Sequence, residues 1–504
     1  MKFLLTALLL CWLAPITHAQ LSDRLWLGGY AEFPDVAGYG HFTLRFQDGA
    51  VQVQPMPLTF QFESTVAVAA DTAGQLLFYA NGCAVANRQH EIMPNGQGLN
   101  PGSLSDQVCP GKGYVVPQGA MVLPMPGDSN RYCLLHLGAA YEPGRKLRLG
   151  PLYYTIVDMS LQNGLGEVVS KNNLLLDGDL GAFTVIRHGN GRDWWVLVPE
   201  FGNRIWHTWL LSTQGLAAMP PQTIALAGGA CEHYAQTATS PDGSRIANWG
   251  DCRVTVLDFD RCAGLLDGPL ELAAPTHWFA GGGVAFSPSG RYLYATSHTV
   301  LFRADLAANA PQLDTMRFSY DPYLHSPYDV PGNSFHYLVN GPDGKIYGNI
   351  PSRARYLHTL KNPDGASIAN IGFAPQNISL PVTNVRTLPH FPNFRLYDLF
   401  GSPCDTLGID GPSVAAHEPD RAAGLGFGLA PNPADAAANV HFWQPFSGTL
   451  CLVDALGRVQ RQQRLDKSSS TTLECQGLPN GIYYLQVQKE NGTTRSARLV
   501  IVHE

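Results

Sequence analysis

The sequence predicts an all-β protein, with a β-propeller of seven blades followed by a small immunoglobulin-like β-sandwich. The 504 residues include 52 Gly and 37 Pro, and only 14% are charged, which is typical of many short strands joined by tight turns. A turn signature followed by an apolar strand also recurs at intervals of about 47 to 62 residues through the middle of the chain. Regular units of this size favour four-stranded sheets arranged radially.

Each recurring unit begins with Gly, Pro, Asp or Ser and continues with β-branched or aromatic residues. The first group reverses the chain and the second favours a pleated strand. Six units are present, at residues 71–79, 127–135, 189–197, 240–247, 287–294 and 341–347. We expect a seventh blade to combine strands around His41–Phe46 and Asn393–Leu396. Six or eight blades, or unrelated hairpins of a sandwich, remain alternatives.

The chain is expected to divide into four parts. Met1 and Lys2 precede an apolar run, and Ala19 ends a small-residue cleavage motif, so residues 1–19 are predicted to be a signal peptide without lipidation. Residues 20–404 would form the propeller. Residues 405–428 are rich in Gly, Ala and Pro and are predicted to be a linker, and the short strands of residues 429–504 predict the β-sandwich.

Nine cysteines remain after removal of the signal peptide, and export to an oxidising compartment would favour disulfides between them. The candidate pairs are Cys83 with Cys109 and Cys231 with Cys252, although sequence does not establish connectivity. An odd thiol must remain unless chains pair, and Cys133, inside a strand-like run, is expected to be buried and unpaired.

No recognisable catalytic, cofactor-binding or metal-binding motif occurs, so none of these sites is predicted. The net charge of −7, without a long basic cluster, also makes nucleic acid an unlikely partner. Scattered carboxylates next to loops are the only candidates for a catalytic site in a propeller channel, and nothing in their spacing pairs them. They are Glu63, Asp106, Glu200, Glu232, Asp251 and Asp321.

Aromatic residues are concentrated between positions 194 and 278. Rigid aromatic surfaces suit sugar rings or protein partners, so Trp206, Trp209, Trp249 and Trp278 are a candidate ligand platform. Trp194 and Trp195 are more typical of the core between blades. His207, His233 and His277 lack the spacing of metal ligands and are expected to be structural.

Four motifs near the C-terminus resemble the type A sorting domain of the type IX secretion system of Bacteroidota. Their residues are Pro431, Asn432 and Pro433, then Asp454 and Gly457, then Gly481 and Tyr483, and finally Arg498. The resemblance implies that the outer-membrane translocon binds residues 429–504. Residues 27 to about 408 resemble secreted Bacteroidota propeller proteins of unassigned activity, and this second resemblance implies no catalytic residue.

These features predict a protein exported through the periplasm of a Gram-negative cell and then secreted or displayed on its surface, without membrane insertion. We expect the propeller to bind a protein or a glycan. The alternative is a secreted polysaccharide hydrolase or lyase that uses the propeller channel. A broad exposed aromatic patch would favour the first function, and a cluster of three carboxylates converging in the channel would favour the second.

Overall fold

The computed structural model divides into two compact units, Met1–Pro412 and Ser413–Glu504. The predicted signal peptide and most of the predicted linker lie outside the described residues. Among the residues that are described, no helix is long and apolar enough to cross a membrane. The described residues are 22–30, 38–47, 49–56, 61–142, 145–227, 236–250, 253–273, 282–297, 299–317, 334–351, 353–399, 402–407, 427–430, 434–454, 458–489 and 494–503.

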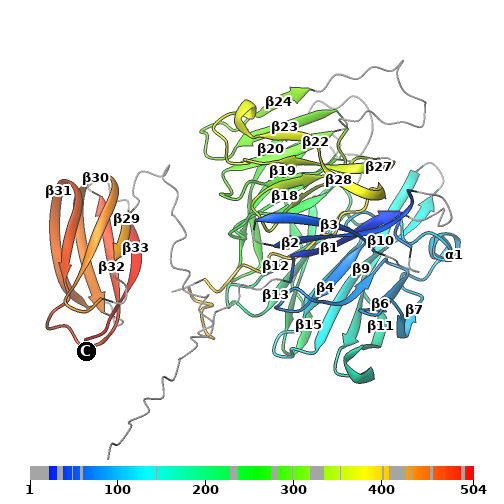
Figure 1. The fold of residues 1–504 in the computed structure, drawn as a ribbon, viewed down its shortest axis with the longest axis horizontal. Coiled ribbons are helices and arrows are strands. Elements are labelled where there is room, and N and C mark those ends of the chain that lie inside the picture. Colours follow the sequence, from blue (N-terminus) through cyan, green and yellow to red (C-terminus); the bar gives the residue numbers. More distant parts are fainter. Residues whose placement is uncertain are drawn as a thin grey trace, which may run out of the picture. The chain divides into compact units, whose positions relative to one another are not determined.

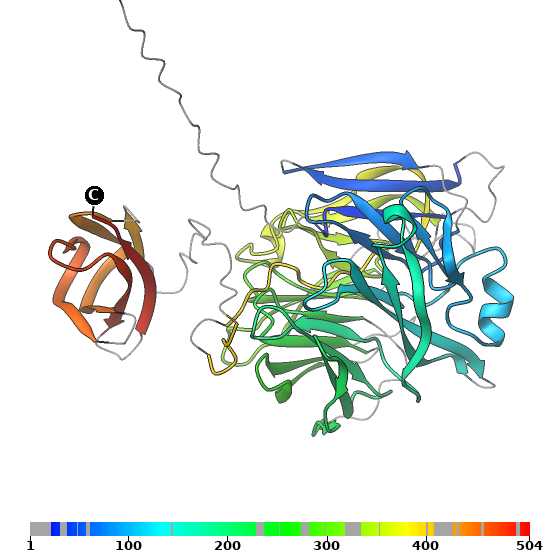
Figure 2. The same cartoon turned by 90° about the horizontal axis from the view of Figure 1, so that it is seen from below.

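The first unit contains seven antiparallel sheets, which follow one another along the chain as blades 1 to 7 (Figures 1 and 2). The strands of the first three blades are β1 (Leu25–Tyr30), β2 (Gly40–Gln47) and β3 (Ala50–Met56); β4 (Ala67–Ala70), β5 (Leu76–Ala80), β6 (Ala84–Asn87) and β7 (Ile92–Gln97); and β8 (Ala120–Pro124), β9 (Arg131–Glu142), β10 (Arg145–Asp158) and β11 (Glu167–Leu176). A short helix, α1 (Ser103–Val108), follows blade 2, and a 3₁₀ turn, η1 (Gln162–Gly164), lies within blade 3.

Blades 4 to 7 repeat the same order of strands. Blade 4 has a fifth strand, β16, which pairs with β14. The strands are β12 (Thr184–Arg187), β13 (Trp194–Pro199), β14 (Ile205–Ser212), β15 (Gly215–Ala218) and β16 (Gln222–Thr223); β17 (Thr237–Thr239), β18 (Arg245–Trp249), β19 (Arg253–Asp260) and β20 (Leu265–Ala273); β21 (Val284–Phe286), β22 (Tyr292–Ser297), β23 (Val300–Asp305) and β24 (Leu313–Arg317); and β25 (Leu338–Asn340), β26 (Ile346–Gly348), β27 (Arg353–Leu360) and β28 (Phe373–Val385), with η2 (Ile368–Asn370) before β28.

The six predicted turns all lie between the first and second strands of blades 2 to 7, as the recurring signature predicts. In blade 5, the Gly243 N–H donates to the Ser240 carbonyl at 2.9 Å, and Gly243 has a φ of 71°. A side chain at that position would be strained in the left-handed conformation, so glycine fits the turn. Asp242 supports the same turn by accepting a hydrogen bond from Ser244 N at 3.0 Å.

The hydrophobic core consists of seven clusters, one between each pair of neighbouring blades. The cluster that joins the last blade to the first contains Trp26 and Phe42 of blade 1 together with Tyr347 and Leu357 of blade 7. The other six clusters join blades 1 and 2, 2 and 3, 3 and 4, 4 and 5, 5 and 6, and 6 and 7. The seven sheets therefore form a closed ring, which confirms the predicted seven-bladed propeller.

The predicted strand at Asn393–Leu396 is wrong. Asn393 instead forms a turn, because its Oδ1 accepts a hydrogen bond from Arg395 N at 3.0 Å and its carbonyl accepts one from Leu396 N at 3.3 Å. Phe394 packs in the cluster between blades 3 and 4, away from the cluster of Phe42. The chain returns to blade 1 slightly earlier, where Leu388 joins the cluster of Trp26 and Phe42.

The second unit is a small β-sandwich, as predicted. Strand β30 pairs with β29 through its first half, with β32 through its second half, and with β31 along most of its length. Val440, Leu452, Leu485 and Leu499 are among the residues that form one separate hydrophobic core. The strands are β29 (Phe427–Ala430), β30 (Ala437–Asp454), β31 (Val459–Glu474), β32 (Gly481–Lys489) and β33 (Thr494–Ile501).

Candidate functional site

The predicted tryptophan platform is wrong for the three members that the structure describes. Trp206, Trp209 and Trp249 are 0%, 7% and 1% exposed, and Trp278 lies outside the described residues. Trp206 faces blade 5 and Trp209 faces blade 3, because the side chains of a strand point to alternate faces of its sheet. A blade has a neighbour on each side, so aromatic side chains on both faces become buried. Trp194 and Trp195 are buried in the same way, as predicted.

The candidate carboxylates are not brought together among the described residues. Glu63 precedes β4, Asp106 lies on α1, and Glu200 follows β13, where its Oε1 lies 2.8 Å from Nε2 of His207. Glu232, Asp251 and Asp321, like His233 and His277, lie outside the described residues. The described part of the chain contains no group of three or more His, Cys, Asp or Glu side chains arranged for a metal ion.

Two glutamines connect blades across the propeller axis. Gln118, just before β8 of blade 3, donates from Nε2 to the carbonyl of Thr237 in blade 5 at 2.7 Å and accepts from Thr237 N at 3.0 Å. Gln236 accepts at Oε1 from Val284 N of blade 6 at 3.0 Å and from Leu338 N of blade 7 at 3.1 Å. Both glutamines are buried, and the first strands that they join are the innermost strands of their blades. Amide side chains therefore occupy the axis at this level.

The segment after β28 completes the inner edge of blade 1. Thr387 Oγ1 donates to the carbonyl of Glu63, before β4, at 3.0 Å, whereas Asn393 Nδ2 donates to the carbonyl of Pro241, after β17, at 2.8 Å. These acceptors lie at opposite ends of the innermost strands, so residues 387–393 run along the axis. Between them, burial lowers the pKa of His390 to about 3, and its Nδ1 lies 3.5 Å from Nε2 of Gln236.

Two disulfides occur among the described residues of the first unit. Cys83 is bonded to Cys109, as predicted, and Cys262 is bonded to Cys404, a pair that the sequence analysis missed. Cys133 is buried and unpaired, as predicted, and burial raises the pKa of its thiol to about 12. Cys451 and Cys475 are also free in the second unit, whereas Cys231 and Cys252 lie outside the described residues.

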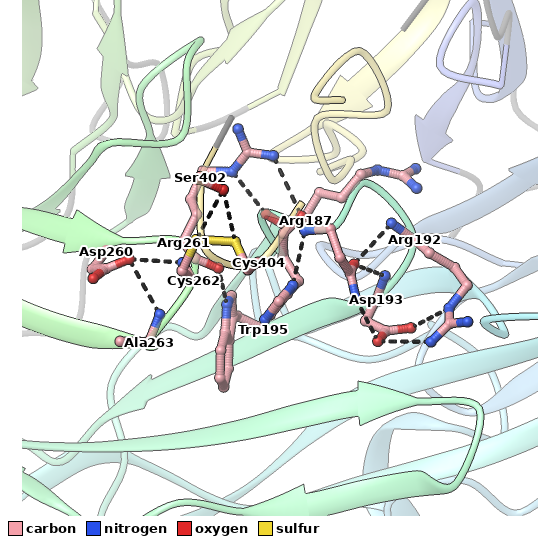
Figure 3. Close-up of a disulfide and its surroundings, with 12 residues drawn as sticks. Arg187, Arg192, Asp193, Trp195, Asp260, Arg261, Cys262, Ala263, Ser402 and Cys404 are labelled. Carbon is pink, nitrogen blue, oxygen red and sulfur yellow. Dashed lines mark hydrogen bonds and ion pairs between the residues drawn. A yellow bond between two sulfur atoms is a disulfide. The ribbon is translucent and has the colours of Figure 1, made fainter. Parts of the chain in front are cut away.

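The Cys262–Cys404 disulfide fixes the end of the propeller chain to the turn after β19 (Figure 3). Arg261, in the same turn, donates from Nε to the carbonyl of Arg187 at 2.9 Å and from Nη2 to the carbonyl of Tyr397. Trp195 Nε1 donates to the carbonyl of Arg261 at 2.8 Å. Burial lowers the pKa of Arg261 to about 10, so the guanidinium remains charged at neutral pH. This network joins blades 4 and 5 to the C-terminal segment.

Blade 3 carries a long hairpin that the repeat pattern did not predict. Strands β9 and β10 contain 12 and 14 residues, whereas β18 and β19 of blade 5 contain 5 and 8. At about 3.3 Å per residue, the additional residues of β9 extend the hairpin by roughly 20 Å. The hairpin can be followed through the labels β9 and β10 in Figure 1. Residues 143–144, at its tip, lie outside the described residues.

Tyr141, near the end of β9, is 61% exposed, the highest value among the large hydrophobic side chains of the described residues. Three contacts hold the hairpin near this side chain. Ala139 N donates to Oη of Tyr114 at 2.8 Å, and Glu142 Oε1 lies 2.8 Å from Nε of Arg148. Arg148 Nη1 also donates to the carbonyl of Gly178 at 2.6 Å. The exposed aromatic ring therefore stands on an anchored hairpin.

Other exposed apolar side chains occur on the same blade. Leu174, on β11, is 59% exposed, and Val169 and Leu161 are 43% and 38% exposed. Four of the ten exposed large hydrophobic residues in the described ranges thus belong to blade 3. The residue types of β9 give no direct signal for this exposure, because Tyr141 follows an apolar run that is buried. The signal for the hairpin in the sequence is the long interval between the turn signatures that begin at residues 127 and 189.

The second unit places part of the predicted sorting motif in turns. Asp454 Oδ1 accepts a hydrogen bond from Arg458 N at 2.9 Å, and its Oδ2 accepts from Arg458 Nε at 2.8 Å. Tyr483, in β32, donates from Oη to the carbonyl of Pro479 at 2.8 Å. Gly481 begins β32 and Arg498 lies in β33. Pro431, Asn432, Pro433 and Gly457 lie outside the described residues.

Comparisons with solved structures find weak similarity over about seven tenths of the chain. A proposed 6-phosphogluconolactonase from Bacteroides fragilis is 13% identical, with 72% of this chain and 96% of that chain covered and a TM-score of 0.45. A protein from Lactobacillus plantarum is 11% identical, with 73% of this chain and 98% of that chain covered and a TM-score of 0.42. The periplasmic gluconolactonase PpgL of Pseudomonas aeruginosa is 13% identical, with 71% of this chain and 96% of that chain covered and a TM-score of 0.42. At these values the similarity transfers no activity to this chain.

The second unit has a clear family match. No curated protein matches the chain in sequence. Residues 429–502, however, match the family model of the secretion system C-terminal sorting domain. This range is nearly the one predicted from the sequence, 429–504, and it includes the motif residues Asp454, Gly481 and Arg498. The two disulfides are consistent with a location outside the cytoplasm. Residues 429–502 are therefore a type IX secretion sorting domain, and the chain is an exported protein, secreted or held at the cell surface.

Proposed function

We propose that the exported propeller is an extracellular binding module for a protein or a glycan, and that the hairpin of blade 3 contributes to its binding surface. The observation that carries this proposal is the exposure of Tyr141 on an anchored, extended hairpin. A tyrosine offers a flat apolar ring and a polar hydroxyl, and it loses little conformational entropy when it binds. Export by the sorting domain brings this surface into contact with extracellular partners.

Other exposed apolar side chains lie on the same blade. Leu174 and Val169 add apolar area on the outer strand of blade 3. Leu174 pairs with Tyr153, which pairs with His136, five residues before Tyr141 on β9, so Tyr141 and Leu174 lie roughly 17 Å apart along the strands. A ligand must therefore extend along blade 3 to contact both side chains. We infer that the ligand contacts blade 3 rather than the buried tryptophans of blades 4 and 5.

The occupied axis argues against the alternative, an enzyme with its active site in the propeller channel. Gln118, Gln236 and His390 fill the inner end of several blades, and each is less than 9% exposed. A polysaccharide needs an open groove or tunnel to reach catalytic carboxylates. The described residues at the axis instead make hydrogen bonds within the protein.

A glycan array, together with a panel of purified outer-surface proteins, tests the proposal on the full chain. Tyr141→Ala and Leu174→Ala should each weaken binding at least tenfold, because each removes apolar contact area from the surface. Leu265→Ala is the matched control, since Leu265 is 55% exposed but lies on blade 5. Equal binding by all three variants, or the absence of any bound glycan or protein in both panels, would contradict the proposal.

A further inference from the structure

The Cys262–Cys404 disulfide lies at the junction between the propeller and the segment that leads to the sorting domain. Cys404 is one residue before the predicted linker, and its partner is 142 residues earlier in the chain. Hydrogen bonds from Asp405 N to Ser402 O and from Thr406 N to Cys404 O form a turn around Cys404. The disulfide is thus the last covalent connection between the propeller and the chain that follows it within the described residues.

The segment before Cys404 is held by hydrogen bonds spaced along the chain and by the buried side chains of Phe394 and Leu396. Leu399 N donates to the carbonyl of Gly189 at 2.7 Å, the carbonyl of Tyr397 accepts from Arg261, and Asn393 donates to Pro241. These contacts follow one another along the chain, so a pull on residue 405 would break them one after another if the disulfide were absent. The next residues in line, His390 and Thr387, lie along the axis and complete blade 1.

The disulfide connects Cys404 to a well-supported part of blade 5 instead. The N–H groups of Cys262 and Ala263 donate to Asp260 Oδ1 at 2.7 and 3.1 Å, and the buried side chain of Arg261 fixes the same turn (Figure 3). Tension on residue 405 therefore passes through the S–S bond into the turn between β19 and β20. The segment 387–403 lies outside this path.

We propose that the Cys262–Cys404 disulfide is a mechanical lock, which protects the closing segment of the propeller from tension applied through the sorting domain during export. The translocon holds the chain by its sorting domain, and the propeller must follow. A covalent bond remains intact at forces that break hydrogen bonds, so the propeller stays closed as long as the lock is oxidised. Formation of the lock requires the loss of two protons and two electrons from the two thiols to a thiol oxidant before export.

Single-molecule pulling on the full mature chain, with a handle at each end, tests the lock directly. Cys262→Ser/Cys404→Ser should show an additional early extension at low force of roughly 60 Å, which is the length of the released segment at about 3.4 Å per residue. The wild type should lack this step. The control Cys83→Ser/Cys109→Ser removes the other disulfide and should behave like the wild type at this stage.

The wild-type measurement alone can overturn the proposal, even if the lock variant does not fold. A 60 Å step at low force in the oxidised wild type would show that the disulfide does not protect the segment. The absence of the step from a folded lock variant would show that the segment resists tension without the disulfide. Either outcome would contradict the mechanical role.

An export experiment separates this role from simple stabilisation. In a host with the secretion system, the lock variant should be degraded or retained when it carries the sorting domain, but a chain that ends at Leu407 should accumulate intact in the periplasm. The Cys83→Ser/Cys109→Ser variant should show no such dependence on the sorting domain. Equal loss of the lock variant with and without the sorting domain, or loss in neither case, would overturn the proposal.

Discussion

Gln118 and Thr237 are joined by two hydrogen bonds across the propeller axis, although they belong to blades 3 and 5. The side-chain amide of Gln118 donates to the carbonyl of Thr237 and accepts from its N–H. It thus makes the two hydrogen bonds that the backbone of a neighbouring strand would make. The hydroxyl of Thr237 extends the connection, since it donates to the carbonyl of Ala182 before blade 4 at 2.7 Å. Three consecutive blades are thereby fixed at their inner ends.

This connection predicts a large loss of stability for Gln118→Leu. The substitution keeps an apolar chain of similar length, but it leaves the buried N–H and carbonyl of Thr237 without partners, at a cost of about 2 to 4 kcal/mol in unfolding free energy. Thermal and urea unfolding of the full chain, followed by near-UV circular dichroism, would measure it. Gln214→Leu, at an exposed turn of blade 4, is the control and should change stability by less than about 0.5 kcal/mol.

Buried histidines predict a loss of stability in mild acid. Burial lowers the pKa of His136 and His390 to about 3 and that of His41 and His358 to about 4. Below pH 6.5 the unfolded chain binds protons that the folded chain does not, so the unfolding free energy should fall as the pH drops from 6.5 towards 4. Each histidine contributes up to about 1.4 kcal/mol per pH unit in this window.

The variant His390→Phe checks the contribution of one of these groups. It keeps a flat ring at the axis near Tyr337 but removes the titrating group. The slope of unfolding free energy against pH between 6 and 5 should become shallower by up to about 1.4 kcal/mol per pH unit. An unchanged slope would mean that His390 is protonated in the folded protein in this range.

Gly189 should tolerate no side chain, because a Cβ there would lie 2.4 Å from Sγ of Cys404 and 3.1 Å from Sγ of Cys262. Gly189→Ala should therefore displace the disulfide and destabilise the protein by about 1 to 3 kcal/mol. Thermal unfolding and peptide mapping of the Cys262–Cys404 bond would measure both effects. Gly111→Ala is the control, since a Cβ at Gly111 meets nothing within 4 Å. Identical behaviour of the two variants would show that the sulfur atoms shift without cost.

Blades 2 to 7 could be predicted because each contains a local signal, the turn between its first and second strands. The turns at Ser240–Gly243 and Ser287–Gly290 require residues that form tight reversals, and strands follow directly in the chain. Closure of the ring depends on contacts between distant residues, such as Thr387 with Glu63, and no local pattern marks them. For this reason a strand was expected at Asn393–Leu396, where the structure has a turn, whereas the contact with blade 1 comes from Leu388 a few residues earlier.

The candidate site was harder to predict because aromatic content does not reveal exposure. Trp206 and Trp209 belong to one strand and face two different blades, so the same pattern that suggested a platform places both in the core. Tyr141 differs from them in its position, because it lies beyond the part of β9 that pairs with β8. One signal was available for Cys262 and Cys404, because they were the two cysteines of the propeller region left without a role once Cys133 and the two candidate pairs had been assigned.

The sorting domain gives the last prediction, which is that residues 427–504 are sufficient for export and are not needed by the propeller. The second unit has its own hydrophobic core, and the last covalent cross-link of the first unit among the described residues is at Cys404. A chain that ends at Leu407 should therefore remain in the periplasm of a host with the secretion system, because it lacks the domain that the translocon binds, and it should keep the melting temperature of the propeller within about 2 °C.

A periplasmic reporter followed by residues 408–504 should reach the culture medium or the cell surface, as measured by fractionation and by protease accessibility of intact cells. The matched control is the same reporter with Leu452→Asp and Leu485→Asp, which place charges in the core of the sorting domain and should prevent its folding. Export of the truncated chain, or retention of the reporter with the intact domain, would contradict a separate sorting role for these residues.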